Sequence, residues 1–304
     1  MGAGMAGVAC GRALADAGHM PLILDKGRGI GGRIATRRST NVQFDHGAQY
    51  VTARHPEFAA VLDAMRRDGA AANWVDGTGR QHVVGTPGMS ALVRYLAKGL
   101  DIRQQVEVTA LHRVAEGWQI ETADRPITAR RIIVTTPAPQ TAALLGPDHV
   151  FAAHLSGVEM APCLTLMATT RATPAPPFVS QRQTNSPLAW IAQDSHKPGR
   201  AAAGLCTWVA QASAEWSARH LEHDKDAIAQ LMLPLLCTHL GISVADVESA
   251  AAHRWRYARV NTPLGQPFLR DADASVYAGG DWCLGPRVEA AWQSGTAIAH
   301  DILG

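Results

Sequence analysis

The chain opens with Met1-Gly2-Ala3-Gly4-Met5-Ala6-Gly7, which places three glycines in the G-x-G-x-x-G spacing. One glycine of this pattern permits a tight turn, the second lets the backbone approach a pyrophosphate, and the third lets the following helix pack closely on a sheet. Residues 6–17 are predicted to form that helix, whose N-terminus can bind phosphate through free N–H groups and the helix dipole. The opening stretch therefore predicts a dinucleotide-binding unit.

A buried-strand pattern follows the predicted helix. Leu22-Ile23-Leu24 is a continuous apolar run, and Asp25 closes it, 18 positions after Gly7. The dinucleotide fingerprint places an acidic residue at this distance, where it binds the ribose hydroxyls. The same carboxylate would repel an adenosine 2′-phosphate. A glycine-rich turn between packed elements is the alternative interpretation, but the combination of helix, strand and acid favours the nucleotide site.

The fingerprint normally follows a strand that is buried on both faces of its sheet. Here Gly2 directly follows Met1, so the first strand of the unit is missing from the sequence. We expect either that the true start lies upstream or that another segment fills this position. A chain built without the strand is expected to bind its cofactor poorly.

Composition limits the class of protein. The 304 residues allow two domains, and a hydrophobic content of 47% with a charged content of 18% is ordinary for a globular protein. A net charge of +2 gives no reason to expect nucleic acid or acidic membranes as partners. The five cysteines are scattered, without a C-x-x-C pair, which indicates free thiols in a reducing compartment and no metal site. Without a visible signal peptide or membrane span, a cytoplasmic protein is expected.

Several predicted strands end in small or polar residues. Residues 27–32 form a glycine loop closed by Arg33, whose charge can neutralise a diphosphate. The predicted strand 131–135 ends beside Thr136, and ligands of α/β sheets lie beyond such carboxyl ends. A short strand also leads into a run of small and polar residues that suits a backbone lying against a flat ligand, namely Asp45-His46-Gly47-Ala48-Gln49.

The rest of the chain alternates between helix and strand patterns. Helices are predicted over 56–67, 90–97 and 224–240, a hairpin over 74–85, and strands over 102–114 and 117–122. Residues 151–252 combine strand-like runs with proline-rich turns, and Pro174-Ala175-Pro176-Pro177 is expected to be an exposed connection. The C-terminal part returns to the nucleotide pattern, with a strand that runs into Gly280-Asp281 and a final helix with an apolar stripe.

These features resemble two-domain flavoproteins of the amine-oxidase and p-hydroxybenzoate-hydroxylase type. More narrowly, five stretches resemble the bacterial renalase-like family, and together they extend over nearly the whole chain. They are Phe44-Asp45-His46-Gly47-Ala48-Gln49-Tyr50, Gly85-Thr86-Pro87-Gly88-Met89-Ser90, Ser195-His196-Lys197-Pro198-Gly199-Arg200, His253-Arg254-Trp255-Arg256-Tyr257-Ala258 and Gly280-Asp281-Trp282-Cys283.

The resemblance implies an α/β protein, in which an inserted α+β substrate domain with a mixed antiparallel sheet interrupts a Rossmann-like FAD-binding domain that lacks its first strand. The FAD-binding domain is expected to comprise residues 1–50, 98–150 and 256–304, and the substrate domain residues 51–97 and 151–255.

The resemblance also implies non-covalently bound FAD and assigns residues to it. The diphosphate would be held by Gly2, Gly4, Ala6, Gly7 and Arg33, with Gly32 in the same loop. Asp25 and Lys26 would meet the adenosine ribose, and the backbone of Val106 the adenine, although the residues alone favour a strand core position for Val106. The isoalloxazine would lie along Asp45, His46, Gly47, Ala48 and Gln49, with Asp281 at the ribityl or diphosphate region and Val288 at the pyrimidine edge.

The implied activity is that of an FAD-dependent oxidase, with a small-molecule dinucleotide substrate and O2 as partners. Isomeric dihydronicotinamide dinucleotides (misreduced NAD(P)H) would be oxidised to NAD(P)+ by hydride transfer to flavin N5, and O2 would be reduced to H2O2. Because the cofactor carries this chemistry, no catalytic side chain is expected. A flavin amine oxidase, a desaturase-like oxidoreductase, and a truncated chain without flavin activity are the alternatives.

Candidate residues for binding the substrate are mostly aromatic, because planar side chains stack on planar ligands. They are Gln49, Trp190, Trp255, Arg256, Tyr257, Trp282 and Trp292. A core aromatic is the alternative for each tryptophan and is favoured for Trp292, which lies on the apolar stripe of the last helix. A surface ion pair is the alternative for Arg256.

Overall fold

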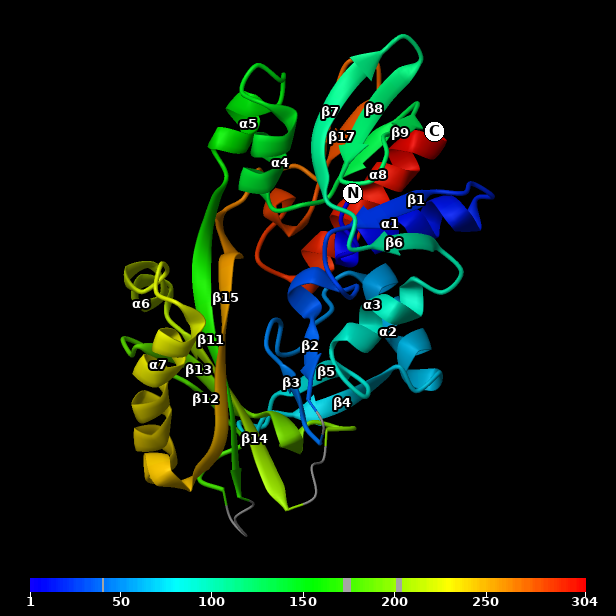
Figure 1. Cartoon of the computed structure of the whole chain (residues 1–304). Helices are drawn as coiled ribbons and strands as arrows, with labels where there is room; N and C mark the ends of the chain where they lie inside the picture. The colour runs from blue at the N-terminus through cyan, green and yellow to red at the C-terminus, as the bar shows by residue number, and fades with distance from the viewer. Residues whose placement is uncertain (40, 172–175, 201–203) are drawn as a thin grey trace.

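A computed structural model describes residues 1–39, 41–171, 176–200 and 204–304. Within these ranges no helix is both long and apolar enough to cross a membrane. Pro174 and Ala175 of the predicted proline-rich connection lie outside the described residues, whereas Pro177 is exposed as expected. The elements form a nucleotide-binding half, built from both ends of the chain, and a half built around a five-stranded sheet (Figure 1).

The nucleotide-binding half has the predicted α/β arrangement. Helix α1 (Met5–Asp16) leads to β1 (Leu22–Asp25), which pairs in parallel with β6 (Asp101–Gln104). β10 (Ile132–Val134) pairs in parallel with β17 (Val276–Ala278), and β16 (Leu269–Arg270) adds an antiparallel edge. The last helix, α8 (Val288–Leu303), packs on α1 at Gly295, where a Cβ atom would lie only 2.0 Å from the Ala6 carbonyl oxygen.

Met1 and Gly2 connect the two parallel pairs of strands. The Met1 amino group donates to the Ile133 oxygen at 2.6 Å, and the Gly2 N–H donates to the Leu24 oxygen at 2.8 Å. A cavity of about 730 Å³ lies beside them, lined by α1, β1, β10 and the segment 127–131. Burial lowers the pKa of the Met1 amino group to about 6. Met1 and Gly2 together thus hydrogen-bond to both β10 and β1.

Smaller elements surround this half. β7 (Val108–Val114), β8 (Gly117–Thr122) and β9 (Ile127–Ala129) form an antiparallel sheet beside α4 (Ala138–Leu145) and α5 (Ala152–Ser156). The short ladder β2 (Thr36–Arg38) with β3 (Gln43–Asp45) projects toward the other half (Figure 1). Beside it lie α2 (Pro56–Arg67), β4 (Ala71–Val75), β5 (Gln81–Gly85) and α3 (Ser90–Leu96), close to their predicted positions.

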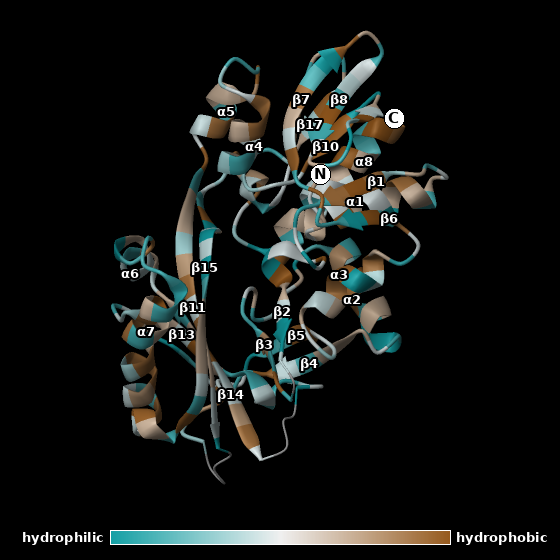
Figure 2. Ribbon diagram, viewed as in Figure 1, coloured by the Kyte–Doolittle hydropathy of each residue, from teal (hydrophilic) through white to brown (hydrophobic). Residues whose placement is uncertain are grey.

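The second half is a five-stranded antiparallel sheet in the order β12-β13-β14-β11-β15. Its strands are β12 (Ser180–Arg182), β13 (Leu188–Gln193), β14 (Leu205–Ala212), β11 (Glu159–Arg171) and β15 (Val247–Thr262). One face is covered by α6 (Ala214–Arg219) and by α7 (Lys225–Leu240), which carries both hydrophilic and hydrophobic residues (Figure 2). Apolar residues of α7 pack with those of the sheet in one buried cluster. Asp224 caps α7 through the Ala227 N–H, as predicted for this acid.

The long strand β15 has no counterpart among the predicted elements. Its sequence is rich in alanine and arginine and lacks a clean apolar alternation, so the strand depends on pairing with β11 along its length. The predicted domain boundary between residues 255 and 256 falls inside this strand.

The cavity beside Met1 yields a prediction about stability. Joining four strand-forming apolar residues to Met1 is expected to raise Tm, because each buried valine or isoleucine contributes about 1.5–3 kcal/mol. For a domain of this size each kcal/mol corresponds to about 2–4 °C. Thermal unfolding followed by circular dichroism measures the change. A four-residue Gly-Ser extension, which also turns the buried amino group into a peptide N–H, is the control, and equal Tm values for the two extensions would contradict the prediction.

Candidate functional site

A glycine-lined cradle lies at the N-terminus of α1. Gly4 is the N-cap residue of α1. Because glycine has no side chain, it cannot bind the first N–H groups of the helix. A Cβ atom at Gly4 would meet nothing within 4 Å, whereas one at Gly7 would lie 2.0 Å from the Gly2 oxygen. Gly31 donates to the Ala3 oxygen at 2.8 Å and brings the second glycine loop to the first. Tight backbone, free helix N–H groups and open space fit the diphosphate of the FAD that the resemblance implies.

Asp25 joins these two glycine loops. Its carboxylate accepts the N–H groups of Ala3 and Gly27, each at 2.6 Å, and its backbone oxygen accepts the Val106 N–H at 3.0 Å. An ionised carboxylate offers about four acceptor positions, so about two remain for ribose hydroxyls. Lys26 lies beside it at the surface, 3.4 Å from Glu107.

Arg33 and Asp281 bring the two ends of the chain together. The guanidinium group donates to both oxygens of the Asp281 carboxylate, at 2.8 and 2.6 Å. Two other predicted cofactor residues are linked to the segment around Asp281: Val288 begins α8 shortly after it, and the Thr136 oxygen accepts the Trp282 indole N–H at 3.0 Å. Residues predicted for the diphosphate, the ribityl chain and the pyrimidine edge thus come from segments that the fold places near α1 and α8.

The predicted isoalloxazine segment, residues 45–49, forms a turn whose backbone is held from several sides. The His46 oxygen accepts the Trp255 indole N–H at 2.8 Å, and the Gly47 oxygen accepts the Gln211 amide at 2.7 Å. The Ala48 N–H donates to the Arg33 oxygen at 2.8 Å. A Cβ atom at position 47 would lie 2.0 Å from that same Arg33 oxygen, so the close approach requires glycine. We call residues 45–49 the flavin-side turn.

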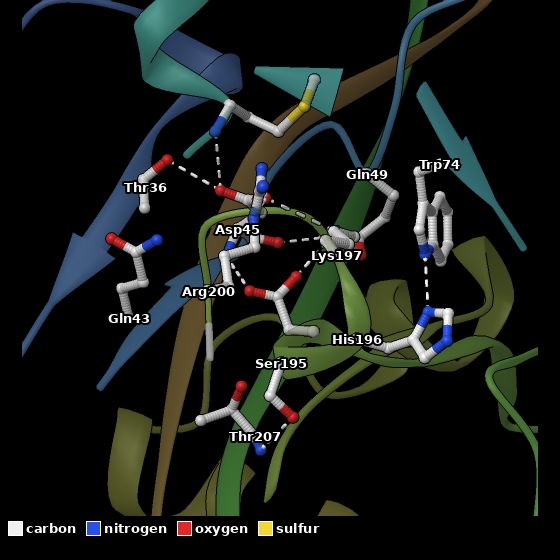
Figure 3. A network of polar contacts seen from close by, with 12 residues as sticks. Thr36, Gln43, Asp45, Gln49, Trp74, Ser195, His196, Lys197, Arg200 and Thr207 are labelled. Atoms are coloured by element: carbon white, nitrogen blue, oxygen red, sulfur yellow. Dashed lines mark hydrogen bonds and ion pairs between the residues drawn. The ribbon is translucent and has the colours of Figure 1, made fainter. Parts of the chain in front are cut away.

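Beneath the flavin-side turn lies a network of two acids and two bases, which we call the buried charge network (Figure 3). It consists of Asp45, Asp194, Lys197 and Arg200, whose side chains are all fully buried. Arg200 contacts the Asp45 carboxylate at 2.6 Å, and Lys197 contacts Asp194 at 2.6 Å. Asp45 also accepts the Thr36 hydroxyl at 2.7 Å and the Met89 N–H at 2.9 Å.

The two carboxyl groups of the buried charge network have opposite pKa shifts. Burial opposes ionisation of Asp45, but Lys197, Arg200 and the Met89 N–H outweigh it and lower its pKa. Burial, reinforced by the negative charge of Asp45, raises the pKa of Asp194 despite the nearby Lys197. Asp45 is therefore the stronger acid of the pair.

Burial also controls two imidazoles beside the flavin-side turn. It lowers the pKa of His46, and together with the nearby His46, Lys225 and Arg37 side chains it lowers the pKa of His253 to about 4. Both rings are therefore neutral at pH 7. They pack around Trp255, with ring centroids 5.2 Å from His46 and 4.2 Å from His253, and form an uncharged aromatic surface next to Gly47.

The structure distributes the predicted substrate residues among different environments. The Gln49 amide is used within the protein, with its oxygen 3.1 Å from Lys197 and its nitrogen donating to the Asp45 and Gly47 oxygens. Trp190 is buried beside Tyr50, and its indole nitrogen has no partner among the described residues. Arg256 forms an ion pair with Glu222 at the surface, as in the alternative interpretation of this residue.

The other aromatic candidates lie in the core or beside it. Trp282 is fully buried, and Trp292 packs on Phe58 with ring centroids 5.3 Å apart, whereas Tyr257 is half-buried. Trp255 is the candidate that contacts the flavin-side turn directly. The substrate contacts of these residues remain predictions.

Sequence reasoning assigned no individual role to Asp194, Lys197 or Arg200. Charged residues are exposed by default, so their sequence gives no sign of burial. The stretch 195–200 could have indicated this network, because it carries two basic residues directly after a buried strand. It entered the sequence analysis only through the family resemblance.

The buried charge network yields a prediction for unfolding. Arg200→Leu leaves Asp45 and Asp194 with Lys197 as their remaining cation, and it is expected to cost about 3–5 kcal/mol in the free energy of unfolding. Urea titration measures the loss. The matched control is Arg256→Leu, whose partner Glu222 is exposed, so about 1 kcal/mol or less is expected. Equal losses in both variants would show that the network is not electrostatically important.

Comparison with known proteins shows the family. Residues 69–303 match the flavin containing amine oxidoreductases, and residues 1–65 match the NAD(P)-binding Rossmann-like domain. A putative protoporphyrinogen oxidase from Exiguobacterium sp. 255-15 has a similar structure, with a TM-score of 0.80 and 13% identity over 99% of this chain and 97% of the other. Cyclohexylamine oxidase from Brevibacterium oxydans IH-35A gives a TM-score of 0.74 at 13% identity, over 100% and 98%.

Wild-type putrescine oxidase bound to putrescine gives a TM-score of 0.70 at 12% identity, over 99% of this chain and 97% of the other. At such identities these likenesses show the fold alone, whereas the family match extends over most of the sequence. The open glycine cradle and the free N-terminus of α1 fit the cofactor of that family. The chain belongs to the flavin containing amine oxidoreductases, and its cofactor is FAD.

Proposed function

We propose that this protein is a renalase-like oxidase that converts isomeric dihydronicotinamide dinucleotides to NAD(P)+. In this proposal the FAD diphosphate lies in the glycine cradle at α1, and the isoalloxazine lies along the flavin-side turn. When bound, FAD accepts the hydride of the dihydropyridine and passes the electrons to O2. The residues of this chain bind and orient the two rings.

The five stretches that resemble the renalase-like family lie close together in the structure, which supports the proposal. Asp45 of the first stretch is bonded to Met89 of the second and to Arg200 of the third. Trp255 of the fourth stretch donates to the flavin-side turn, and Asp281 of the fifth pairs with Arg33, whose oxygen holds Ala48. Segments separated by more than 200 residues thus meet around one turn, as expected if they form one binding site.

The charge of the site is the observation that favours a dinucleotide over an amine as the substrate. Both acids of the buried charge network are paired with Lys197 or Arg200, so the network offers no free negative charge to an ammonium group. Arg37 lies close enough to the flavin-side turn to lower the pKa of both His46 and His253. Such surroundings repel a cationic amine and attract the phosphates of a dinucleotide. The neutral surface formed by His46, Trp255 and His253 suits stacking of a planar dihydropyridine.

Amine oxidation is the second candidate, favoured by the family match and by the likeness to cyclohexylamine and putrescine oxidases. It requires a site that accepts a positively charged or neutral amine next to the same turn. The two functions therefore differ in the charge of the preferred substrate.

The test is anaerobic bleaching of the flavin absorption in the FAD-loaded protein. We expect the isomeric dihydronicotinamide dinucleotides to bleach it at least about tenfold faster than ordinary NADH, putrescine or cyclohexylamine. Added salt should raise KM for the isomers, because ions screen the attraction of phosphates to basic residues. Rapid bleaching by an amine but not by the isomers would overturn the proposal in favour of amine oxidation.

A matched pair of variants sharpens this test. Arg37→Gln removes a positive charge beside the turn and is expected to raise KM for the isomers several-fold with little change in kcat. Arg219→Gln removes a charge from the exposed surface of α6 and should leave both constants unchanged. An unaltered KM in Arg37→Gln would mean that the basic surroundings do not select the substrate.

A further inference from the structure

The orientation of the Gln49 amide is fixed completely by its partners. Its oxygen accepts from the Lys197 ammonium at 3.1 Å, and its nitrogen donates to the backbone oxygens of Asp45 and Gly47. Both donors and the acceptor are therefore used inside the protein. Gln49 is buried and works as a brace across the flavin-side turn rather than as a free ligand for the substrate.

Lys197 determines which way this brace faces. Its side chain is fully buried, and its three N–H donors have three acceptors: Asp194 at 2.6 Å, Gln49 at 3.1 Å and Asp45 at 3.5 Å. The ammonium also lies 5.5 Å from the centre of the Trp74 ring. Because an ammonium can only donate, it holds the amide oxygen toward itself and the amide nitrogen toward the turn (Figure 3).

The brace fixes the peptide planes of the flavin-side turn. In a trans peptide the C=O and the next N–H point in opposite directions. Binding of the Asp45 oxygen by Gln49 and of the His46 oxygen by Trp255 therefore directs the N–H groups of residues 46 and 47 to the opposite side. The Gly47 oxygen has a second donor, Gln211, but the Asp45 oxygen depends on Gln49.

We propose that Lys197 is a positioning residue for the flavin, which acts through Gln49 to hold the flavin-side turn in the conformation that receives the isoalloxazine. This inference rests on the FAD placement given under Proposed function. Lys197 lies in the substrate half, between β13 and β14. In this proposal it controls how the flavin-side turn of the nucleotide-binding half contacts the flavin, and it does so without touching the substrate.

A purely electrostatic role makes a different prediction. The buried charge network holds two positive and two negative side chains, so Lys197→Met alone leaves an uncompensated negative charge. The double variant Lys197→Met with Asp194→Asn restores neutrality, and the asparagine keeps an acceptor for the Asp45 N–H, which now bonds to Asp194 at 3.0 Å. The double variant keeps the neutral Arg200–Asp45 pair and removes the Lys197 donors to Gln49 and Asp45, so it separates positioning from net charge.

The experiment compares the dissociation constant of FAD, the visible flavin spectrum and the flavin reduction potential in four variants. These are the double variant, Gln49→Leu, the triple variant that combines them, and Lys98→Met as an exposed-lysine control. We expect the double variant to stay folded and to bind FAD about fivefold more weakly, since a lost hydrogen bond is worth about 1 kcal/mol. Its spectrum and potential should shift as in Gln49→Leu, the triple variant should add nothing further, and the control should match the original protein.

Two results would overturn the proposal. One is a double variant with the original FAD affinity, spectrum and potential. The other is a triple variant whose losses are the sum of the separate losses, which would mean that Lys197 and Gln49 act independently. None of these measurements uses a substrate, so they remain decisive even if the dihydronicotinamide isomers fail to bleach the flavin.

Discussion

The negative charge of a buried carboxylate must be balanced by nearby positive charges and hydrogen-bond donors. This requirement determines how the segments at the centre of the molecule are arranged. Asp45 ends β3 with no exposed surface, and leaving such a charge unpaired would cost several kcal/mol. Its partners therefore come from every segment that meets there: Thr36 from β2, Met89 from the start of α3, and Arg200 from the loop after β13. Each of these bonds also fixes the position of the segment that supplies it.

The hydrogen bonds that compensate Asp45 continue into the proposed cofactor site. The same residue begins the flavin-side turn, whose Ala48 N–H is bound by the Arg33 oxygen. The Arg33 side chain in turn donates to the Asp281 carboxylate, a few residues before α8. One continuous series of bonds thus runs from the core of the substrate half, through the turn, to the helix pair that frames the glycine cradle. A change in the buried charge network is consequently expected to reach the proposed FAD site.

Local patterns predicted the nucleotide-binding half well, and long-range contacts explain what they did not predict. The glycine fingerprint, α1, β1, α2 and the capped helix α7 are each determined by residues close in sequence. The strand β15 is not, since its identity depends on a partner about 90 residues away. The burial of Lys197 and Arg200 depends on Asp45, which lies about 150 residues earlier. No spacing rule in a single sequence reveals such compensation between distant charges.

The continuous ladder between β11 and β15 has a consequence for motion. The two strands pair from Glu159 with Thr262 to Thr170 with Val247, interrupted by three bulges, and they run from the vicinity of the nucleotide-binding half to the far end of the sheet (Figure 1). Two of the irregularities, between Glu159 and Met160 and between Ala161 and Cys163, lie near the end of the ladder closest to the nucleotide-binding half, where they locally disrupt the pairing. Because the two strands are bonded to each other along this length, any tilt of the five-stranded sheet relative to the nucleotide-binding half moves them together as one ribbon.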